Sequence, residues 1–230
     1  MKTKYLTLAI LATMAFVSLV SCHKDSDEPA HQTINWVDLG LPSGLLWADR
    51  NVGADSPEGY GGYYAWGATC TTYTYNYSTY PYGTATNQLT KYCTRADRGL
   101  DGFTDTLTTL VPGDDVATVK IGDGARTPTA EEWHELIDNT TGIWTTQNGV
   151  NGRLLTGRNG NTLFIPAAGF RAGPELYSTG KGCNYWSSTL QTSEPELAIC
   201  IGFISHYPWN TMGNGDRTSG FSIRAVRNAQ

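Results

Sequence analysis

The sequence predicts an α+β fold with short antiparallel sheets, one or two helices and long ordered loops. Strand-like segments occur toward both ends of the chain, and a well-marked helix lies between them. The composition agrees, because 26 Gly, 13 Tyr and 7 Trp are typical of short strands, tight turns and loops rather than of a helical bundle. No Pro- or Ser-rich linker interrupts residues 34–230, so we expect this part to form a single domain.

The first half of that domain contains few regular elements. Residues 36–39 and 45–48 flank Gly-Leu-Pro-Ser-Gly at 40–44, a pattern that indicates a hairpin. Residues 62–66 form another strand candidate. Residues 68–110 are rich in Thr, Tyr, Gly and Asp and lack apolar periodicity, so we expect a long loop region, and such regions often carry function.

One helix is clearly marked in the middle of the chain. Thr129 is a good N-cap, and Glu132 three residues later completes a capping box. Trp133 and Leu136 then share one face, and Asn139 ends the helix. A shorter helix is expected over residues 114–120.

The second half of the chain predicts strands. Residues 153–156 and 162–165 are joined through Asn159-Gly160, a dipeptide that favours a tight hairpin turn. Three further strands are predicted at 185–188, 197–204 and 221–226. The run at 197–204 is almost entirely apolar, which places it at the centre of a sheet.

Large side chains provide candidates for the core. Four tryptophans stand beside apolar neighbours and are expected to be buried: Trp47, Trp66, Trp133 and Trp186. Arg126 and Arg224 are either buried ion-pair partners that hold the helix start and the last strand, or plain surface residues.

The first 33 residues resemble the export and anchoring region of a bacterial lipoprotein. Lys2 and Lys4 precede an apolar run, which is the order found in secretory signals. The run ends in a string at 19–22 that resembles a lipobox, which implies cleavage of residues 1–21 and lipidation of Cys22. The alternative is ordinary secretion with Cys22 left as a thiol.

Residues 22–33 contain no apolar residue suited to a core, so they predict a disordered acidic tether. Their acidic cluster resembles the surface-export signal of Bacteroidetes lipoproteins. We therefore expect a lipid-anchored protein of the bacterial outer membrane, exposed at the cell surface rather than in the periplasm.

The charge of the mature chain excludes one class of partner. The full chain has 16 Lys and Arg; removing Lys2 and Lys4 leaves 14, against 21 Asp and Glu, a balance of −7. A chain this acidic has no stripe of basic residues for a phosphate backbone, so nucleic acid is not expected as a partner.

Four cysteines follow Cys22, and an exported chain meets oxidising conditions. They are Cys70, Cys93, Cys183 and Cys200. Two disulfides would allow three connectivities, of which we expect the local pairs Cys70–Cys93 and Cys183–Cys200. Metal binding is less favoured, because no Cys-x-x-Cys spacing occurs.

Several strings together resemble the Fibrobacter succinogenes major paralogous domain family. The most specific is Arg-Thr-Pro-Thr-Ala-Glu-Glu-Trp at 126–133, and the strings at 37–44, 185–188 and 226–227 also fit the family pattern. They extend from residue 36 to 227 and so cover nearly the whole mature chain. The resemblance implies a C-type-lectin-like fold, in the branch that includes the formylglycine-generating enzyme, whose ending resembles residues 220–224.

No catalytic set is complete. The oxidase of that branch needs two closely spaced redox cysteines, whereas Cys183 and Cys200 are seventeen residues apart and no Cys-x4-Cys string occurs. His134 and Asp138 have the spacing of the zinc-protease helix, but a third ligand is missing. We therefore expect a domain that is not an enzyme and requires no cofactor.

Aromatic residues are the main candidates for ligand binding. Tyr73, Tyr75 and Tyr77 would share one face of an extended segment, and Tyr80 follows closely. Exposed rings stack on sugars; the alternative is that these are half-buried strand residues. Two further candidates, Trp209 and Asn210, resemble part of the Trp-Asn-Asp string of sugar-binding C-type lectins.

Acidic residues gather between positions 97 and 115, and a structural calcium ion would offset their repulsion. The candidate ligands are Asp101, Asp105, Asp114 and Asp115. Alternatively, Asp114 or Asp115 caps the short helix.

The sequence as a whole predicts a surface lipoprotein with a non-catalytic domain that binds carbohydrate or a host or matrix protein, as an adhesin or a glycan-capture component. The alternatives are an enzyme of the same fold with an unidentified site and a structural subunit of a surface fibre or complex.

Overall fold

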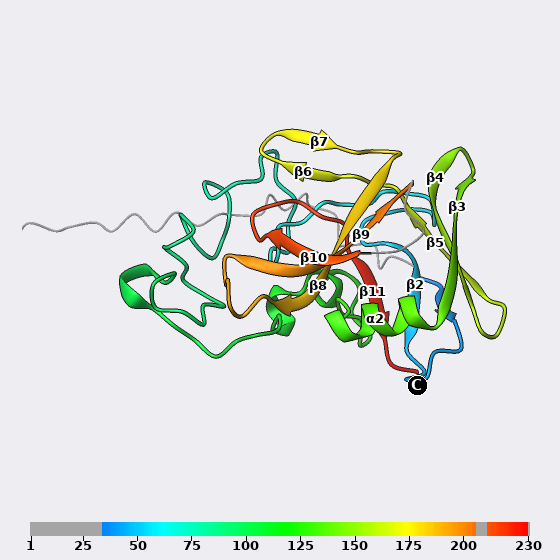
Figure 1. Cartoon of the computed structure of the whole chain (residues 1–230), viewed down its shortest axis with the longest axis horizontal. Coiled ribbons are helices and arrows are strands. Elements are labelled where there is room, and N and C mark those ends of the chain that lie inside the picture. The colour runs from blue at the N-terminus through cyan, green and yellow to red at the C-terminus, as the bar shows by residue number, and fades with distance from the viewer. Residues whose placement is uncertain (1–33, 206–210, 230) are drawn as a thin grey trace, which may run out of the picture.

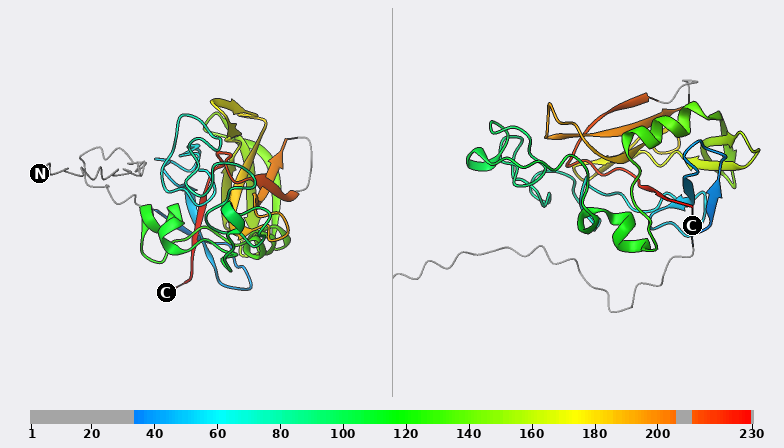
Figure 2. Two further views of the ribbon diagram at one scale, coloured as in Figure 1. Left: turned by 90° about the vertical axis from the view of Figure 1, so that its left-hand side faces the viewer. Right: turned by 90° about the horizontal axis from the view of Figure 1, so that it is seen from below.

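The structure, a computed structural model, describes residues 34–205 and 211–229. Within these residues it contains four small antiparallel sheets and two α-helices, so the predicted α+β class is confirmed (Figure 1). The loops around residues 68–110 lie at one end of the molecule and a three-stranded sheet lies at the other (Figure 2). No helix in these two ranges is both long and apolar enough to cross a membrane.

The first sheet joins the two ends of the described chain. Strands β1 (Trp36–Asp38) and β2 (Leu46–Asn51) form the predicted hairpin around residues 40–44. The last strand, β11 (Arg224–Arg227), pairs with the other edge of β2. The buried Arg224 reinforces this pairing, because its guanidinium donates to Ala48 O of β2 at 3.0 Å.

The second sheet lies at the centre of the molecule. Strand β9 (Leu197–Ile204) pairs with β8 (Gly182–Leu190) on one side and β10 (Thr211–Asp216) on the other, so its predicted central position is confirmed. An apolar run suits this position because both faces are covered. Cys200 packs into one core cluster and Phe203 into a second.

The four tryptophans confirm their predicted place in these cores. Trp66 and Trp186 belong to the first cluster, and Trp47 and Trp133 belong to the second. Each is at most 1% exposed. Trp47 and Trp133 pack with ring centroids 4.7 Å apart, in the tilted geometry that favours aromatic pairs.

The third sheet contains the predicted Asn159-Gly160 hairpin and one strand that sequence patterning missed. Its order is β3 (Thr140–Gln147), β4 (Val150–Gly157) and β5 (Thr162–Pro166). Strand β3 was not predicted because four threonines and a glycine hide the apolar alternation that marks a half-buried strand. Its edge position makes such alternation unnecessary.

A small fourth sheet was also missed. Strands β6 (Phe170–Ala172) and β7 (Glu175–Tyr177) form a hairpin around Gly173-Pro174. Each strand has only three residues, too few to show a period. The hairpin attaches to the rest of the molecule through the backbone bridge of Arg171 with Gly220.

Both predicted helices are present. Helix α2 (Ala130–Asp138) begins at the Thr129 N-cap, and both hydrogen bonds of the capping box with Glu132 are formed. Helix α1 (Val116–Ile121) is capped by Asp115, whose carboxylate accepts from Ala117 N at 3.0 Å. The short helix therefore starts two residues later than the expected position 114.

The region before these helices is irregular, as predicted for residues 68–110. Its one helical piece within those bounds is the 3-10 turn η1 (Leu100–Gly102), and η2 (Pro112–Asp114) follows just after them. The strand expected at 62–66 is not formed. Tyr64 forms an isolated bridge to Phe221 there, and Gly62 N and Trp66 N donate to Val52 O and Arg217 O without forming a strand.

The expected disulfide pairs are not formed, because Cys93, Cys183 and Cys200 are buried free thiols. Cys183 lies opposite Phe203 in the β8–β9 ladder, whereas Cys200 lies opposite Trp186. The two cysteines are therefore three positions apart along the ladder and face different cores, farther apart than the span of a disulfide. The Cys93 thiol instead donates to Arg95 O at 3.1 Å.

Candidate functional site

The predicted tyrosine platform is only partly exposed. Tyr75 is 4% exposed, and its hydroxyl donates to Tyr63 O at 2.6 Å. Burial raises the pKa of Tyr75 above its ordinary value. The prediction of a shared exposed face is therefore wrong for this residue, because residues 73–80 follow bends and turns instead of an extended strand.

Tyr80 is also part of the interior. It is 6% exposed, its hydroxyl donates to Trp66 O at 3.0 Å and it accepts from Arg217 Nε at 2.7 Å. Burial raises the pKa of Tyr80 to about 12. Tyr77 is half-buried and packs edge-on against Tyr80 with ring centroids 6.2 Å apart. The Tyr80 ring is therefore closed to a ligand, whereas the Tyr77 ring is partly accessible.

Tyr73 is the predicted binding residue that the structure leaves open. Its side chain is 83% exposed. Trp209 and Asn210, the other two candidates, lie outside the described residues. Of the six residues expected to bind ligand, Tyr73 alone is mostly exposed in the described part of the chain.

Tyr73 lies close to the tip of the β6–β7 hairpin. Two residues after it, Tyr75 exchanges backbone hydrogen bonds with Gly173 at 2.8 and 3.0 Å. The bridge is isolated and residues 73–74 form a bend, so it fixes Tyr75 at the hairpin tip, two residues from Tyr73. Figure 1 shows the same arrangement, with the 70–80 region beside the hairpin.

Strand β7 adds two exposed side chains to this region. Leu176 is 39% exposed and Tyr177 is 45% exposed. Tyr177 is held in place by stacking on Phe170 of β6, with ring centroids 5.4 Å apart and an interplanar angle of 25°. Leu176 points to the opposite face of the hairpin from Tyr177, because successive side chains of a strand alternate. We call Tyr73 and Tyr177 the hairpin surface.

Charged groups accompany the hairpin surface. Glu175 is exposed at the start of β7. Arg171 of β6 lies over the Tyr63 ring, with its guanidinium carbon 5.3 Å from the ring centroid. Glu175 shares the face of Tyr177 on β7, so a carboxylate accompanies the exposed ring and offers hydrogen bonding beside stacking.

Sequence reasoning missed Leu176 and Tyr177. The available signal was the Gly173-Pro174 pair, which marks a turn, with aromatic residues three to four positions away on each side. The stacking of Tyr177 on Phe170 across that turn depends on the strand pairing, which single-sequence patterning does not show.

The four candidate calcium ligands do not form one group. Asp105 accepts backbone hydrogen bonds from Tyr92, Cys93 and Leu107, and so organises its own loop. Asp101 is exposed in η1. Among the described residues, no set of three or more His, Cys, Asp or Glu side chains is arranged to hold a metal. The structural calcium ion stays a prediction.

Asp115 and Asp114 each have protein partners. Asp115 caps α1 and also accepts from Thr127 N and Oγ1 at 2.8 and 2.7 Å, which confirms the alternative interpretation as a helix cap. Asp114 Oδ2 lies 2.6 Å from Lys91 Nζ and accepts from the Tyr92 hydroxyl. Burial acts to raise the pKa of Asp114, but hydrogen bonds led by the one from Lys91 outweigh it and hold that pKa below the usual range.

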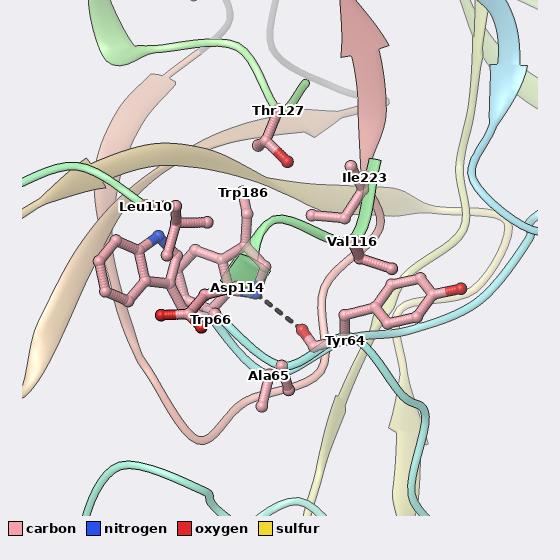
Figure 3. A pocket seen from close by; sticks show the side chains of 11 residues that line it. Tyr64, Ala65, Trp66, Leu110, Asp114, Val116, Thr127, Trp186 and Ile223 are labelled. Carbon is pink, nitrogen blue, oxygen red and sulfur yellow. Dashed lines mark hydrogen bonds between the residues drawn. The ribbon is translucent and has the colours of Figure 1, made fainter. Parts of the chain in front are cut away.

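Asp114 also borders a pocket between the loop region and the first core (Figure 3). The cavity volume is about 10 Å³, room for about one water molecule. Its two indoles are occupied by structural bonds: Trp186 Nε1 donates to Tyr64 O and Trp66 Nε1 to Ser187 O, both at 2.8 Å. The pocket is too small for a sugar ring and belongs to the core packing.

The described thiols are poor nucleophiles. Burial raises the pKa of Cys183 and of Cys200 to about 12, so both remain protonated at neutral pH. His134 is exposed on α2. The structure does not place either thiol beside that histidine in the manner of a catalytic pair, because both thiols are enclosed in the cores.

Comparisons of this chain with protein-family models, with curated proteins and with solved structures gave no match.

Proposed function

We propose that this chain is a lipid-anchored bacterial surface protein whose C-type-lectin-like domain binds carbohydrate or an extracellular protein ligand at the hairpin surface. The observation that carries the proposal is the exposure of Tyr73 and Tyr177 beside a charged hairpin. Exposed tyrosines lose apolar contact with water when a sugar ring or a proline covers them, and their hydroxyls provide hydrogen bonds.

The resemblance to the Fibrobacter succinogenes major paralogous domain family supports the fold part of this proposal. The structure explains the most specific string of this resemblance, residues 126–133. Thr129 and Glu132 cap α2, Arg126 pairs with Glu132 through two hydrogen bonds, and Trp133 is completely buried. The string therefore acts as a structural signature and not as a set of ligand-binding groups.

The test of binding uses glycan and extracellular-matrix arrays, each with and without added calcium. We expect a ligand whose affinity falls at least tenfold in the double variant Tyr73→Ala/Tyr177→Ala, which corresponds to about 1.4 kcal/mol. The matched control is Val119→Ala, because Val119 is 55% exposed on α1, away from the hairpin. The proposed site would be overturned if the protein bound no ligand on either array, or if the double variant bound its ligand with the affinity of the unchanged protein.

The anchor is tested separately. Lipidation requires the Cys22 thiol, so metabolic labelling with a fatty acid should label the full chain and not the Cys22→Ala variant. Digestion of intact cells with an added protease should then remove the protein if it faces outward. If the lipid-labelled protein resists digestion, it faces the periplasm.

A further inference from the structure

Strand β3 leaves one edge of the third sheet bare. The sheet order places β3 outermost, and among residues 34–205 and 211–229 no backbone hydrogen bond joins β3 to any segment except β4. Soluble proteins usually protect an edge of eight residues with a charge, a proline or a bulge. The β3 sequence, Thr-Thr-Gly-Ile-Trp-Thr-Thr-Gln, has no charge or proline, and its pairing with β4 runs without a register shift.

The turn between β3 and β4 determines which backbone groups face outward. Asn148 and Gly149 both have positive φ, 47° and 82°, as in a two-residue type I′ turn. Gln147 and Val150, which flank this turn, therefore form a hydrogen-bonded pair, and pairs alternate from there. The N–H and C=O groups of Thr140, Gly142, Trp144 and Thr146 consequently point away from β4. Consistent with this, Gly142 O lies 3.4 Å from the Arg153 side chain.

An apolar row crosses the sheet and stops at this edge. Phe164 of β5 lies opposite Leu154 of β4, which lies opposite Ile143 of β3. Phe164 is 3% exposed, Leu154 is half-buried and Ile143 is 61% exposed. A further strand beside β3 would cover Ile143 and continue the row.

We propose that the partner is a second copy of this chain, paired antiparallel through β3 about a two-fold axis at Ile143. In this register each threonine lies opposite another: Thr140 with Thr146, and Thr141 with Thr145. Gly142 lies opposite Trp144 and leaves room on its face for the Arg153 side chain of its own chain, and Ile143 meets its own copy.

The symmetry of the strand selects both the partner and the register. A two-fold axis one residue later, at Trp144, places Ile143 opposite Thr145 and Gly142 opposite Thr146, which breaks every threonine pair. The outward backbone groups of Gly142 and Trp144 form hydrogen-bonded pairs in the Ile143 register, as do those of Thr140 and Thr146. The result is one continuous sheet of six strands with an uninterrupted apolar row, built from an isologous contact.

The contact is separate from the hairpin surface, since β3 belongs to a different sheet and lies at the end of the molecule away from the loop region (Figure 1). Loss of ligand binding and loss of self-pairing can therefore be observed independently.

The test is cysteine cross-linking of the full chain in intact cells. Residues at Ile143 would face each other in a non-hydrogen-bonded pair with Cα atoms about 4.5 Å apart, within the range that a disulfide spans. We expect Ile143→Cys to give a disulfide-linked dimer of this chain after mild oxidation. Thr146→Cys is the matched control: in this register the two copies of residue 146 are about 20 Å apart, so it should not cross-link.

A second variant tests the association without added thiols. Ile143→Lys places two like charges on the axis, and we expect it to weaken dimerisation at least tenfold in sedimentation of the detergent-solubilised full chain. Val119→Lys should leave the dimer unchanged, and the circular dichroism spectrum should be the same for both variants. A wild-type chain that stays monomeric, equal cross-linking at position 146, or cross-linking of Ile143→Cys to a different protein would each overturn the proposal.

Discussion

Two of the bulkiest fully buried side chains are arginines. Arg217 and Arg224 are 1% and 0% exposed, and among the described residues neither forms an ion pair. Arg217 donates to the carbonyls of Lys91, Tyr92 and Pro195 and packs against three aromatic rings. A guanidinium has five donors in a fixed plane, so it can tie several loop carbonyls together where no strand pairing exists.

Arg224 shows why sequence alone could not decide between its two interpretations. It is buried, but its partners are Asn51 Oδ1, Ala48 O and Phe164 O instead of a carboxylate. Burial lowers the pKa of this guanidinium from its ordinary value. Backbone acceptors leave no charge pattern in the sequence. By contrast, Arg126 forms the expected ion pair, with Glu132.

Replacing Arg224 should cost much of the stability. Arg224→Met leaves three buried acceptors unpaired, so we expect the free energy of unfolding to fall by about 3 kcal/mol or more. Arg224→Lys should lose nearly as much, because a single ammonium cannot reach all three acceptors. Urea denaturation measures both, with the exposed Arg158→Met as control. A loss under about 1 kcal/mol would show that the bonds are not needed.

A thiol that is buried and protonated in the folded protein predicts a loss of stability at high pH. The folded pKa of Cys200 is raised by burial from 9.0 to about 12. Its contribution is therefore complete below pH 9 and is lost as pH rises toward 12. The free energy of unfolding should fall across this window, and less steeply in Cys200→Ala. Equal slopes in the two proteins would contradict the prediction.

At the scale of elements, the start of α2 is the best-determined feature. Residues 126–133 combine an N-cap, a capping box, an ion pair and a buried indole within eight positions. Trp133 Nε1 also donates to Trp186 O of β8 at 3.2 Å, which orients the helix against the central sheet. Local and tertiary interactions therefore favour the same helix start.

Thr129→Ala should lower the free energy of unfolding by about 1 kcal/mol, because Glu132 N loses its hydroxyl acceptor. Thr129→Ser keeps that acceptor and should have little effect. Thermal or urea unfolding compares the three proteins, and equal losses in both variants would assign the cost to the lost methyl group instead of the cap.

At the scale of the whole molecule, stability is distributed between two unlike parts. The central sheet separates two dense cores, in which the tryptophans are the largest fully buried side chains. The loops at 68–110 depend on side-chain hydrogen bonds, chiefly those of Arg217, Asp105 and Tyr80. They contribute Tyr75 and Tyr80 to a smaller cluster and Tyr92 to the first core. A region held by a few polar ties opens more readily than a packed sheet.

The three free thiols allow this difference to be measured. Cys93 lies in the loop region, whereas Cys183 and Cys200 lie in the central sheet. In increasing urea, Cys93 should react with iodoacetamide at lower concentration than the other two, as followed by mass spectrometry of peptides. Reaction of all three at the same concentration would indicate one cooperative unit.

The sequence by itself determined the α+β class, the first hairpin, both helices, the capping box of α2 and the central position of β9. These features depend on short-range patterns: turn dipeptides, N-caps and continuous apolar runs. Tertiary structure decided the rest. It buried Tyr75 and Tyr80 and left Tyr73 exposed. It also formed the β6–β7 hairpin, which no hydrophobic periodicity in the sequence predicted, and it kept the thiols of Cys183 and Cys200 apart. It also left β3 at a sheet edge. Burial and register arise from segments far apart in the chain, so a residue's neighbours in sequence do not specify them.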